Sequence, residues 1–173
     1  MTTPKGKFAG LALIAALFAG VTLGLTAQAW AGWDEGQAAY QRGDYATALR
    51  EFRPLAEQGN ALAQNKLGYM YRNGIGVTQD YAEAVKWYRK AAEQGYAKAQ
   101  FNLGIMYDNG LGVPQDYAQA HMWFNFAASS FPPGKDRDKA LKERDRVAKK
   151  MTPAQISEAQ KLAREWKPKK LGR

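Results

Sequence analysis

Residues 61–95 read ALAQNKLGYMYRNGIGVTQDYAEAVKWYRKAAEQG, and residues 97–131 read AKAQFNLGIMYDNGLGVPQDYAQAHMWFNFAASSF. The two stretches are identical at 19 of 35 aligned positions, whereas unrelated sequences of average composition would share roughly two or three. The triplet Asp-Tyr-Ala also recurs every 36 residues, beginning at positions 44, 80 and 116. This periodicity predicts a protein built from stacked structural repeats.

Each repeat predicts two amphipathic helices. Ala63, Leu67 and Met70 in the first half of the repeat share one helical face, and their counterparts recur 36 residues later. The apolar stripe of the second half consists of Tyr81, Ala84, Val85, Tyr88, Ala91 and Ala92. Because each helix has one apolar face, it must bury that face against a neighbour, so we expect the helices to stack.

Turn and cap residues mark the ends of these helices. Gly74 and Gly110 follow the first helix of each repeat, where glycine suits the left-handed C-terminal position. Asp80 and Asp116 precede the second helix, and each is followed three residues later by Glu or Gln, which is the spacing of a capping box. We therefore interpret both acids as helix caps and not as catalytic carboxylates.

Two further glycines, Gly68 and Gly104, lie inside the predicted first helices. Glycine in a helix interior costs about 1 kcal/mol relative to alanine, so a compensating contact is expected. We predict that a partner helix approaches closely at both positions, where a side chain would block it.

The positions that stay fixed between the copies form a recognisable pattern. In the first copy they are Ala63, Leu67, Gly68, Tyr71, Gly74, Gly76, Val77, Asp80, Ala84, Trp87, Tyr88, Ala91, Ala92 and Gly95. In the second copy they are Ala99, Leu103, Gly104, Tyr107, Gly110, Gly112, Val113, Asp116, Ala120, Trp123, Phe124, Ala127 and Ala128, with Phe131 in place of the closing glycine. This pattern resembles the Sel-one-like repeat, a relative of the tetratricopeptide repeat. The resemblance implies an all-α fold, a short right-handed α-solenoid of helix pairs, and an adaptor role in membrane-linked or envelope-linked complexes.

The regions that flank residues 61–95 and 97–131 predict additional helices. Residues 32–60 look like a degenerate first helix pair with a shorter link. Residues 135–166 predict two helices that cap the exposed apolar end of the array, and the second of them opens with a Thr-Pro-Ala-Gln capping box. Residues 167–173 form a basic tail.

Residues 1–31 predict a secretory signal peptide. Two lysines precede an uncharged run over residues 8–25, and small residues close the segment in an A-x-A pattern. We expect export through the general secretory route with cleavage after Ala31, although a cut after Ala29 also fits, and hence a periplasmic or secreted protein. The alternative is an uncleaved N-terminal membrane anchor, because about 18 to 20 apolar residues can span a bilayer.

The composition argues against most catalytic chemistry. The chain has no cysteine and a single histidine, His121, so it lacks thiol nucleophiles, thiolate metal sites and histidine clusters. We predict a protein that is not an enzyme, with no catalytic residue, cofactor or metal, and we interpret His121 as a packing residue. Some secreted relatives of the resembled family are associated with β-lactam binding or hydrolysis, which leaves such an enzyme as an alternative, although those relatives are rich in cysteine.

A stack of helix pairs curves, and its first helices line a concave face that suits an extended peptide or a partner helix. Positions on these helices that differ between the two copies are either determinants of specificity or tolerated surface. The predicted partner is another protein, bound by a monomer, and export makes a nucleic-acid partner unexpected. The candidate partner-binding residues are Asn65, Lys66, Tyr69, Arg72, Phe101, Asn102, Ile105 and Asp108.

Positive charge is concentrated at the C-terminal end of the chain. Of a formal net charge of +9, residues 132–173 contribute +8, from 14 Lys+Arg against 6 Asp+Glu. This end either faces an anionic phospholipid, wall polymer or acidic protein, or is a solvated face that keeps the protein soluble. The candidate residues for an anionic surface are Arg144, Arg146, Lys149, Lys150, Lys167, Lys169 and Lys170.

Overall fold

The structure is a computed structural model that describes residues 32–168, and the predicted signal peptide, Lys169 and Lys170 lie outside this range. Within it, residues 32–41 are helical and all the regular elements are helices. The elements that follow are α2 (Tyr45–Glu57), α3 (Ala61–Asn73), α4 (Tyr81–Glu93), α5 (Ala97–Asn109), α6 (Tyr117–Ser130), α7 (Lys135–Ala148) and α8 (Pro153–Glu165). None of the described helices combines the length and the apolar character needed to cross a membrane.

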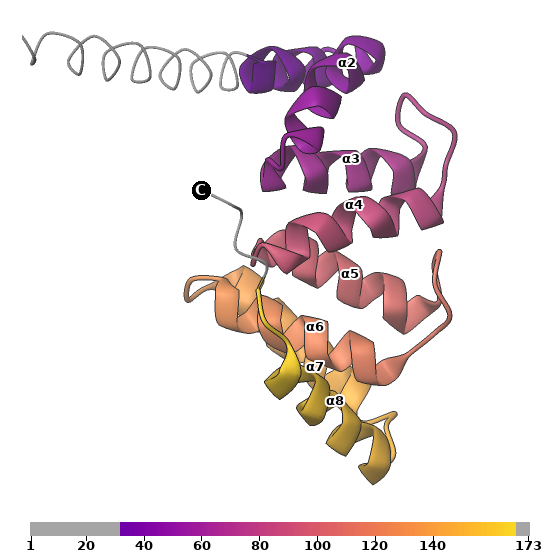
Figure 1. Ribbon diagram of the computed structural model, residues 1–173, viewed down its shortest axis with the longest axis vertical. Coiled ribbons are helices and arrows are strands. Elements are labelled where there is room, and N and C mark those ends of the chain that lie inside the picture. The colour runs from indigo at the N-terminus through magenta and orange to yellow at the C-terminus, as the bar shows by residue number, and fades with distance from the viewer. Residues whose placement is uncertain (1–31, 169–173) are drawn as a thin grey trace, which may run out of the picture.

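The helices are layered in chain order along the long axis of the molecule (Figure 1). From α2 to α7 each helix packs against the next one, and α8 returns to pack against α6. The loops that join α3 to α4 and α5 to α6 emerge on the same side of the stack (Figure 1). The predicted all-α solenoid of helix pairs is confirmed.

The helix ends follow the predicted chemistry, with one exception. Gly74 and Gly110 both adopt the left-handed conformation, with φ of 66°. The Asp80 carboxylate accepts a hydrogen bond from the Glu83 backbone N–H at 2.9 Å, and Asp116 caps α6 in the same way. The reciprocal half of the capping box is not formed, because the Asp80 backbone N–H donates to the Tyr71 carbonyl instead.

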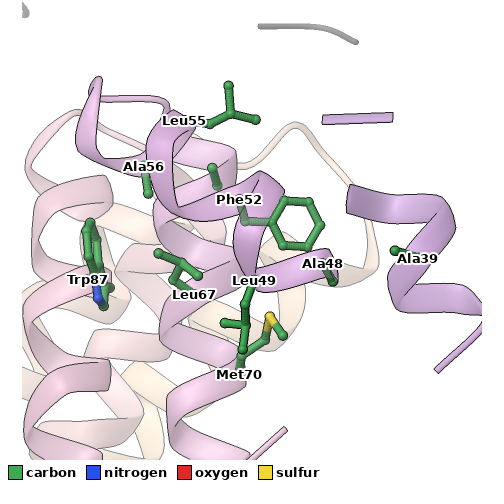
Figure 2. Close-up of a cluster of buried hydrophobic side chains, with 10 residues drawn as sticks. Ala39, Ala48, Leu49, Phe52, Leu55, Ala56, Leu67, Met70 and Trp87 are labelled. Atoms are coloured by element: carbon green, nitrogen blue, oxygen red, sulfur yellow. The ribbon is translucent and has the colours of Figure 1, made fainter. Parts of the chain in front are cut away.

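The hydrophobic core runs between the layers and joins the N-terminal helices to the first repeat (Figure 2). Phe52 of α2 is fully buried, and Trp33 packs on it with ring centroids 5.2 Å apart. Leu67 of α3 and Trp87 of α4 belong to the same cluster, so the first repeat buries its apolar face against α2. The tryptophans that recur in the repeats are core residues, since Trp87 is 7% exposed and Trp123 is 5% exposed.

The glycines inside the first helices permit a close contact, as predicted. A Cβ atom at Gly68 would lie 2.6 Å from the ring of Tyr88, and one at Gly104 would lie 2.8 Å from the ring of Phe124. The neighbour is an aromatic ring from the second helix of the same repeat. These rings are fully buried, and their packing offsets the cost of a helical glycine.

Contacts between successive repeats include a loop glycine that sequence analysis did not single out for this role. Gly112 has φ of 69°, and a Cβ atom there would overlap the backbone carbonyl of Tyr81, at the start of α4. Gly76, one repeat earlier, lies against the equivalent residue Tyr45 at the start of α2, where an added Cβ atom would come 2.5 Å from the Tyr45 Cβ. Each long loop therefore touches the first turn of the preceding second helix, and only glycine fits there.

Two buried glutamines also join successive helices. The side-chain amide of Gln64 donates to the Ala56 carbonyl at 2.9 Å, and that of Gln100 donates to the Ala92 carbonyl at 3.2 Å. The carbonyls lie at the C-terminal end of the preceding helix, where backbone acceptors have no partner within the helix. The same polar contact thus recurs in both copies of the repeat.

The last two helices pack on the end of the array. Val147 of α7 is buried in one cluster with Phe124 of α6, and Phe101 of α5 packs against this cluster. Trp166, directly after α8, lies 4.4 Å from the Phe126 ring of α6 between ring centroids. The helix α8 begins with the predicted full capping box, in which Thr152 and Gln155 exchange hydrogen bonds.

Candidate functional site

A cavity of about 310 Å³ opens on the face shared by α3, α5 and α7, and we call it the groove. Helices α3 and α5 are the first helices of the two repeats, so the 36-residue period brings equivalent positions side by side. Four of the eight candidate partner-binding residues line it. The lining residues are Asn65, Tyr69, Lys98, Phe101, Asn102, Phe131, Asp136 and Lys139.

The groove combines an amide pair with aromatic surface. The Asn102 side-chain amide donates to the side-chain oxygen of Asn65 at 3.1 Å, which bridges α5 to α3. Tyr69 is 42% exposed, one of the few large apolar side chains with such exposure among the described residues. Phe101 packs on Phe124 with centroids 5.4 Å apart, and the Lys139 ammonium lies 5.1 Å from the Phe101 centroid. The site therefore offers hydrogen-bonding groups beside a rigid apolar surface.

Lys66, a predicted contact residue, lies beside the groove. Its ammonium is 4.1 Å from the centroid of the Tyr40 ring, a cation–π distance. Burial, and then repulsion from Lys98, lowers the pKa of the Lys66 ammonium. Neither lysine forms an ion pair with a carboxylate of residues 32–168.

The remaining candidates do not line the groove. Ile105 packs among the apolar side chains between α6 and α7. Arg72 lies near the hydroxyl of Tyr88, where burial raises the pKa of that hydroxyl and the arginine partly opposes the shift. Asp108 is buried with 5% exposure and forms an ion pair with Arg146, while the Lys150 ammonium lies 3.7 Å away.

The burial of Asp108 corrects its predicted role as an exposed contact. The position differs from Arg72 in the first repeat because only the second repeat has α7 beside it, and the Asp108 carboxylate anchors that helix through Arg146. The difference between the copies at this position is therefore explained by internal packing.

Replacing Arg146 with glutamine should destabilise the protein by about 1 to 2 kcal/mol, because the Asp108 carboxylate stays buried without its main partner. The value is at the low end for a buried pair, since the Arg146 side chain is 40% exposed. Urea denaturation of the single variant and of the D108N/R146Q double variant measures the effect. The double variant should recover part of the loss, since a neutral amide costs less to bury, whereas R146Q with the same stability as exposed control K142Q would contradict this coupling.

Some of the basic candidates at the C-terminal end form ion pairs with carboxylates of the same chain. Arg144 forms an ion pair with Asp145 at 2.7 Å, and Arg146 forms one with Glu143 at 2.7 Å as well as with Asp108. Lys149 and Lys167 are exposed. Of the seven candidates, Arg144, Arg146 and Lys150 thus lie against internal carboxylates.

His121 is half-buried and lines a cavity of about 360 Å³ between α6, α7 and α8. Burial lowers the pKa of its imidazole, and the nearby guanidinium of Arg144 lowers it further. No cluster of three His, Asp or Glu side chains within residues 32–168 is arranged to hold a metal ion. The packing interpretation of His121 stays a prediction, while its neighbours in α6, Ala120 and Met122, are buried in the core.

Comparison with known proteins gives close structural relatives. A family model described as Sel1 repeat matches residues 61–96 and 97–130. The chain is 34% identical to a protective antigen of uropathogenic Escherichia coli strains that displays an SLR fold, with a TM-score of 0.72 over 80% of this chain. It spans only 29% of the length of that antigen. No curated protein matches the chain.

A second solved structure is similar over nearly its whole length. The chain is 32% identical to a Sel1 repeat protein from Oxalobacter formigenes, with a TM-score of 0.59 over 72% of this chain and 97% of the other. The matched repeats contain the glycines, aromatic rings and caps that stack α3 to α6. The chain therefore belongs to the Sel1 repeat family.

Proposed function

We propose that this protein is a non-catalytic interaction module that holds an extended segment of another protein in the groove. Sel1 repeat proteins generally mediate protein–protein interactions. The observation that carries the proposal is the groove itself, a cavity of about 310 Å³ that crosses two repeats and the following helix and contains the exposed Tyr69. A cavity at this lower end of the size range of binding pockets accommodates side chains of a segment and not a folded domain.

The chemistry of the groove suits a polypeptide. Asn65 and Asn102 use one hydrogen bond to hold each other, and their remaining amide groups are available to a peptide backbone. Tyr69 and Phe101 provide the aromatic surface that dominates binding energy at protein interfaces. An extended segment satisfies both features, because its backbone groups and its side chains lie on different sides.

Export is part of the proposal. The order of lysines, an uncharged run over residues 8–25 and small residues at the end of residues 1–31 supports a signal peptide. The module then acts in the periplasm or outside the cell. Attachment through the basic C-terminal end is the less favoured function, because three of the seven candidate cations already lie against internal carboxylates.

Photo-crosslinking from inside the groove tests the binding function. A benzoylphenylalanine placed at Tyr69 or at Phe101, which both line the groove, should attach to the same partner species in cells that produce the protein. The same probe at Lys161, which is exposed on α8, is the control and should not give that adduct. Mass spectrometry of the adducts identifies the attached polypeptide.

Two outcomes would contradict the groove function. One is an adduct formed equally from position 161 and from positions 69 and 101, which would indicate non-specific contact. The other is the absence of any adduct from both groove positions while the protein remains folded by circular dichroism.

A further inference from the structure

We propose that the groove selects a partner segment with an acidic side chain, and that Lys66 and Lys98 bind its carboxylate. The inference rests on the proposed groove function and adds the chemistry of the partner. Lys66 comes from α3 and Lys98 from α5, so the two ammonium groups belong to the first helices of successive repeats. Lys98 lines the groove, and Lys66 follows the lining residue Asn65 in the sequence.

The two lysines lack a counter-ion within the described part of the chain. Lys66 is half-buried against the Tyr40 ring, and it is close enough to Lys98 for the two charges to repel each other. Lys98 itself lines the groove. Neither is among the cations paired with carboxylates of residues 32–168. A carboxylate placed between them would relieve this repulsion.

The start of α5 adds to the positive potential. Lys98 is the second residue of α5, which has no acid in its first turn and no side-chain cap from Tyr96. The N-terminal end of a helix carries partial positive charge, so a lysine there is unfavourably placed and an anion is favoured. By contrast, α3, α4 and α6 begin with a side-chain oxygen from Asn60, Asp80 and Asp116 respectively.

The groove also indicates which kind of residue we expect next to the acidic residue of the partner segment. Tyr69 and Phe101 line the same cavity as Lys98, so an apolar residue next to the acidic one would contact the aromatic surface. On the far side of the groove Lys139 and Asp136 of α7 carry opposite charges, so the excess of positive charge lies on the side of α3 and α5. The expected partner segment therefore pairs a Glu or Asp with a large apolar neighbour.

Peptide libraries test this selectivity on the purified protein. Three libraries of C-terminally amidated seven-residue peptides carry Leu-Glu-Leu, Leu-Gln-Leu or Leu-Lys-Leu at the centre, with uncharged residues elsewhere. The Glu library should bind at least tenfold more tightly than the Gln library, and the Lys library should bind least, since charge-assisted hydrogen bonds are the stronger kind. Amidation ensures that the central glutamate is the only carboxylate.

Substitution of the lysines assigns the effect to them. K98Q, at an exposed position, and the K66Q/K98Q double variant should lower affinity for the Glu library toward that for the Gln library and leave the Gln affinity unchanged. The matched control is K86Q/K161Q, which removes two exposed lysines away from the groove and should keep the preference.

Equal binding of the Glu and Gln libraries, retention of none of the libraries, or loss of the preference in the control variant would overturn the acidic-segment inference. None of these results would contradict the proposed groove function, which the crosslinks from positions 69 and 101 test. The proposed function and the acidic-segment inference can therefore fail separately. A preference for the Glu library that also weakens as salt is raised supports the inference, because exposed charges are screened.

Discussion

Replacing Gly112 with alanine is expected to destabilise the protein by about 3 kcal/mol, because two costs combine at one atom. The residue has φ of 69°, a conformation that L side chains rarely adopt, and the added Cβ would overlap the backbone carbonyl of Tyr81. A backbone carbonyl at the start of a helix has no rotamer in which to move away. Equilibrium unfolding in urea, followed by far-UV circular dichroism, measures the loss.

The control for this variant is Gly95→Ala. Gly95 has φ of 87°, but a Cβ atom there would meet nothing within 4 Å. It should therefore show only the cost of the left-handed conformation, about 1 kcal/mol. If the two variants lost the same stability, the tight contact between the loop and α4 would contribute nothing and the interpretation would be wrong.

Replacing Gly104 with leucine is the second change with a large expected effect, a loss of about 3 kcal/mol through overpacking. A Cβ atom at this position would lie 2.8 Å from the Phe124 ring, which is itself fully buried between α5 and α6. The ring cannot move outward without opening the layer between the two helices. The midpoint of thermal unfolding, read by near-UV circular dichroism, reports the change.

A double-mutant cycle tests whether the ring is the obstacle. Phe124→Ala alone should cost about 3 to 5 kcal/mol because it leaves a cavity. In the double variant the leucine fills the space that the ring vacates, so its total loss should be smaller than the sum of the single losses. Additive losses would show that Gly104 is required for a reason other than the Phe124 ring.

Much of the stacking was predictable from the sequence because its causes are local or periodic. A glycine inside an otherwise good helix, as at Gly68, signals a close contact even before the neighbour is known. Helix caps such as Thr152 depend on residues three positions apart, which a single sequence displays. The tryptophans that recur with the 36-residue period could be assigned to the core for the same reason.

Other features depend on contacts between segments that lie far apart in the sequence or outside the repeat. The partner of Gly112 lies 31 residues earlier, at Tyr81, and no local rule connects the two positions. The role of Asp108 depends on α7, whose sequence does not follow the repeat, so Arg146 could not be assigned to it in advance. The difference between the copies at Asp108 is therefore structural, and variation at a fixed position of the repeat does not by itself distinguish packing from partner binding.

The part of the groove that α3 and α5 form was predictable from the sequence, whereas the part that α7 forms was not. Tyr69 and Phe101 were identified because first helices face the same way in every repeat. Lys139 and Asp136 belong to a helix without a repeat register, so only the structure brings them to the groove. Lys98 was missed because it occupies the position of Leu62, an exposed apolar residue, and a lysine on a surface carries no signal by itself.

The loop contact made by Gly112 is the same joint that Gly76 makes one unit earlier, against the start of the preceding second helix. A further copy of the 36-residue unit inserted at this boundary would carry both parts of this contact, the loop glycine and the start of the second helix. Duplication or loss of whole units therefore needs no newly evolved interface. Such a chain can lengthen its array by ordinary recombination, and each added unit would widen the surface available to a partner.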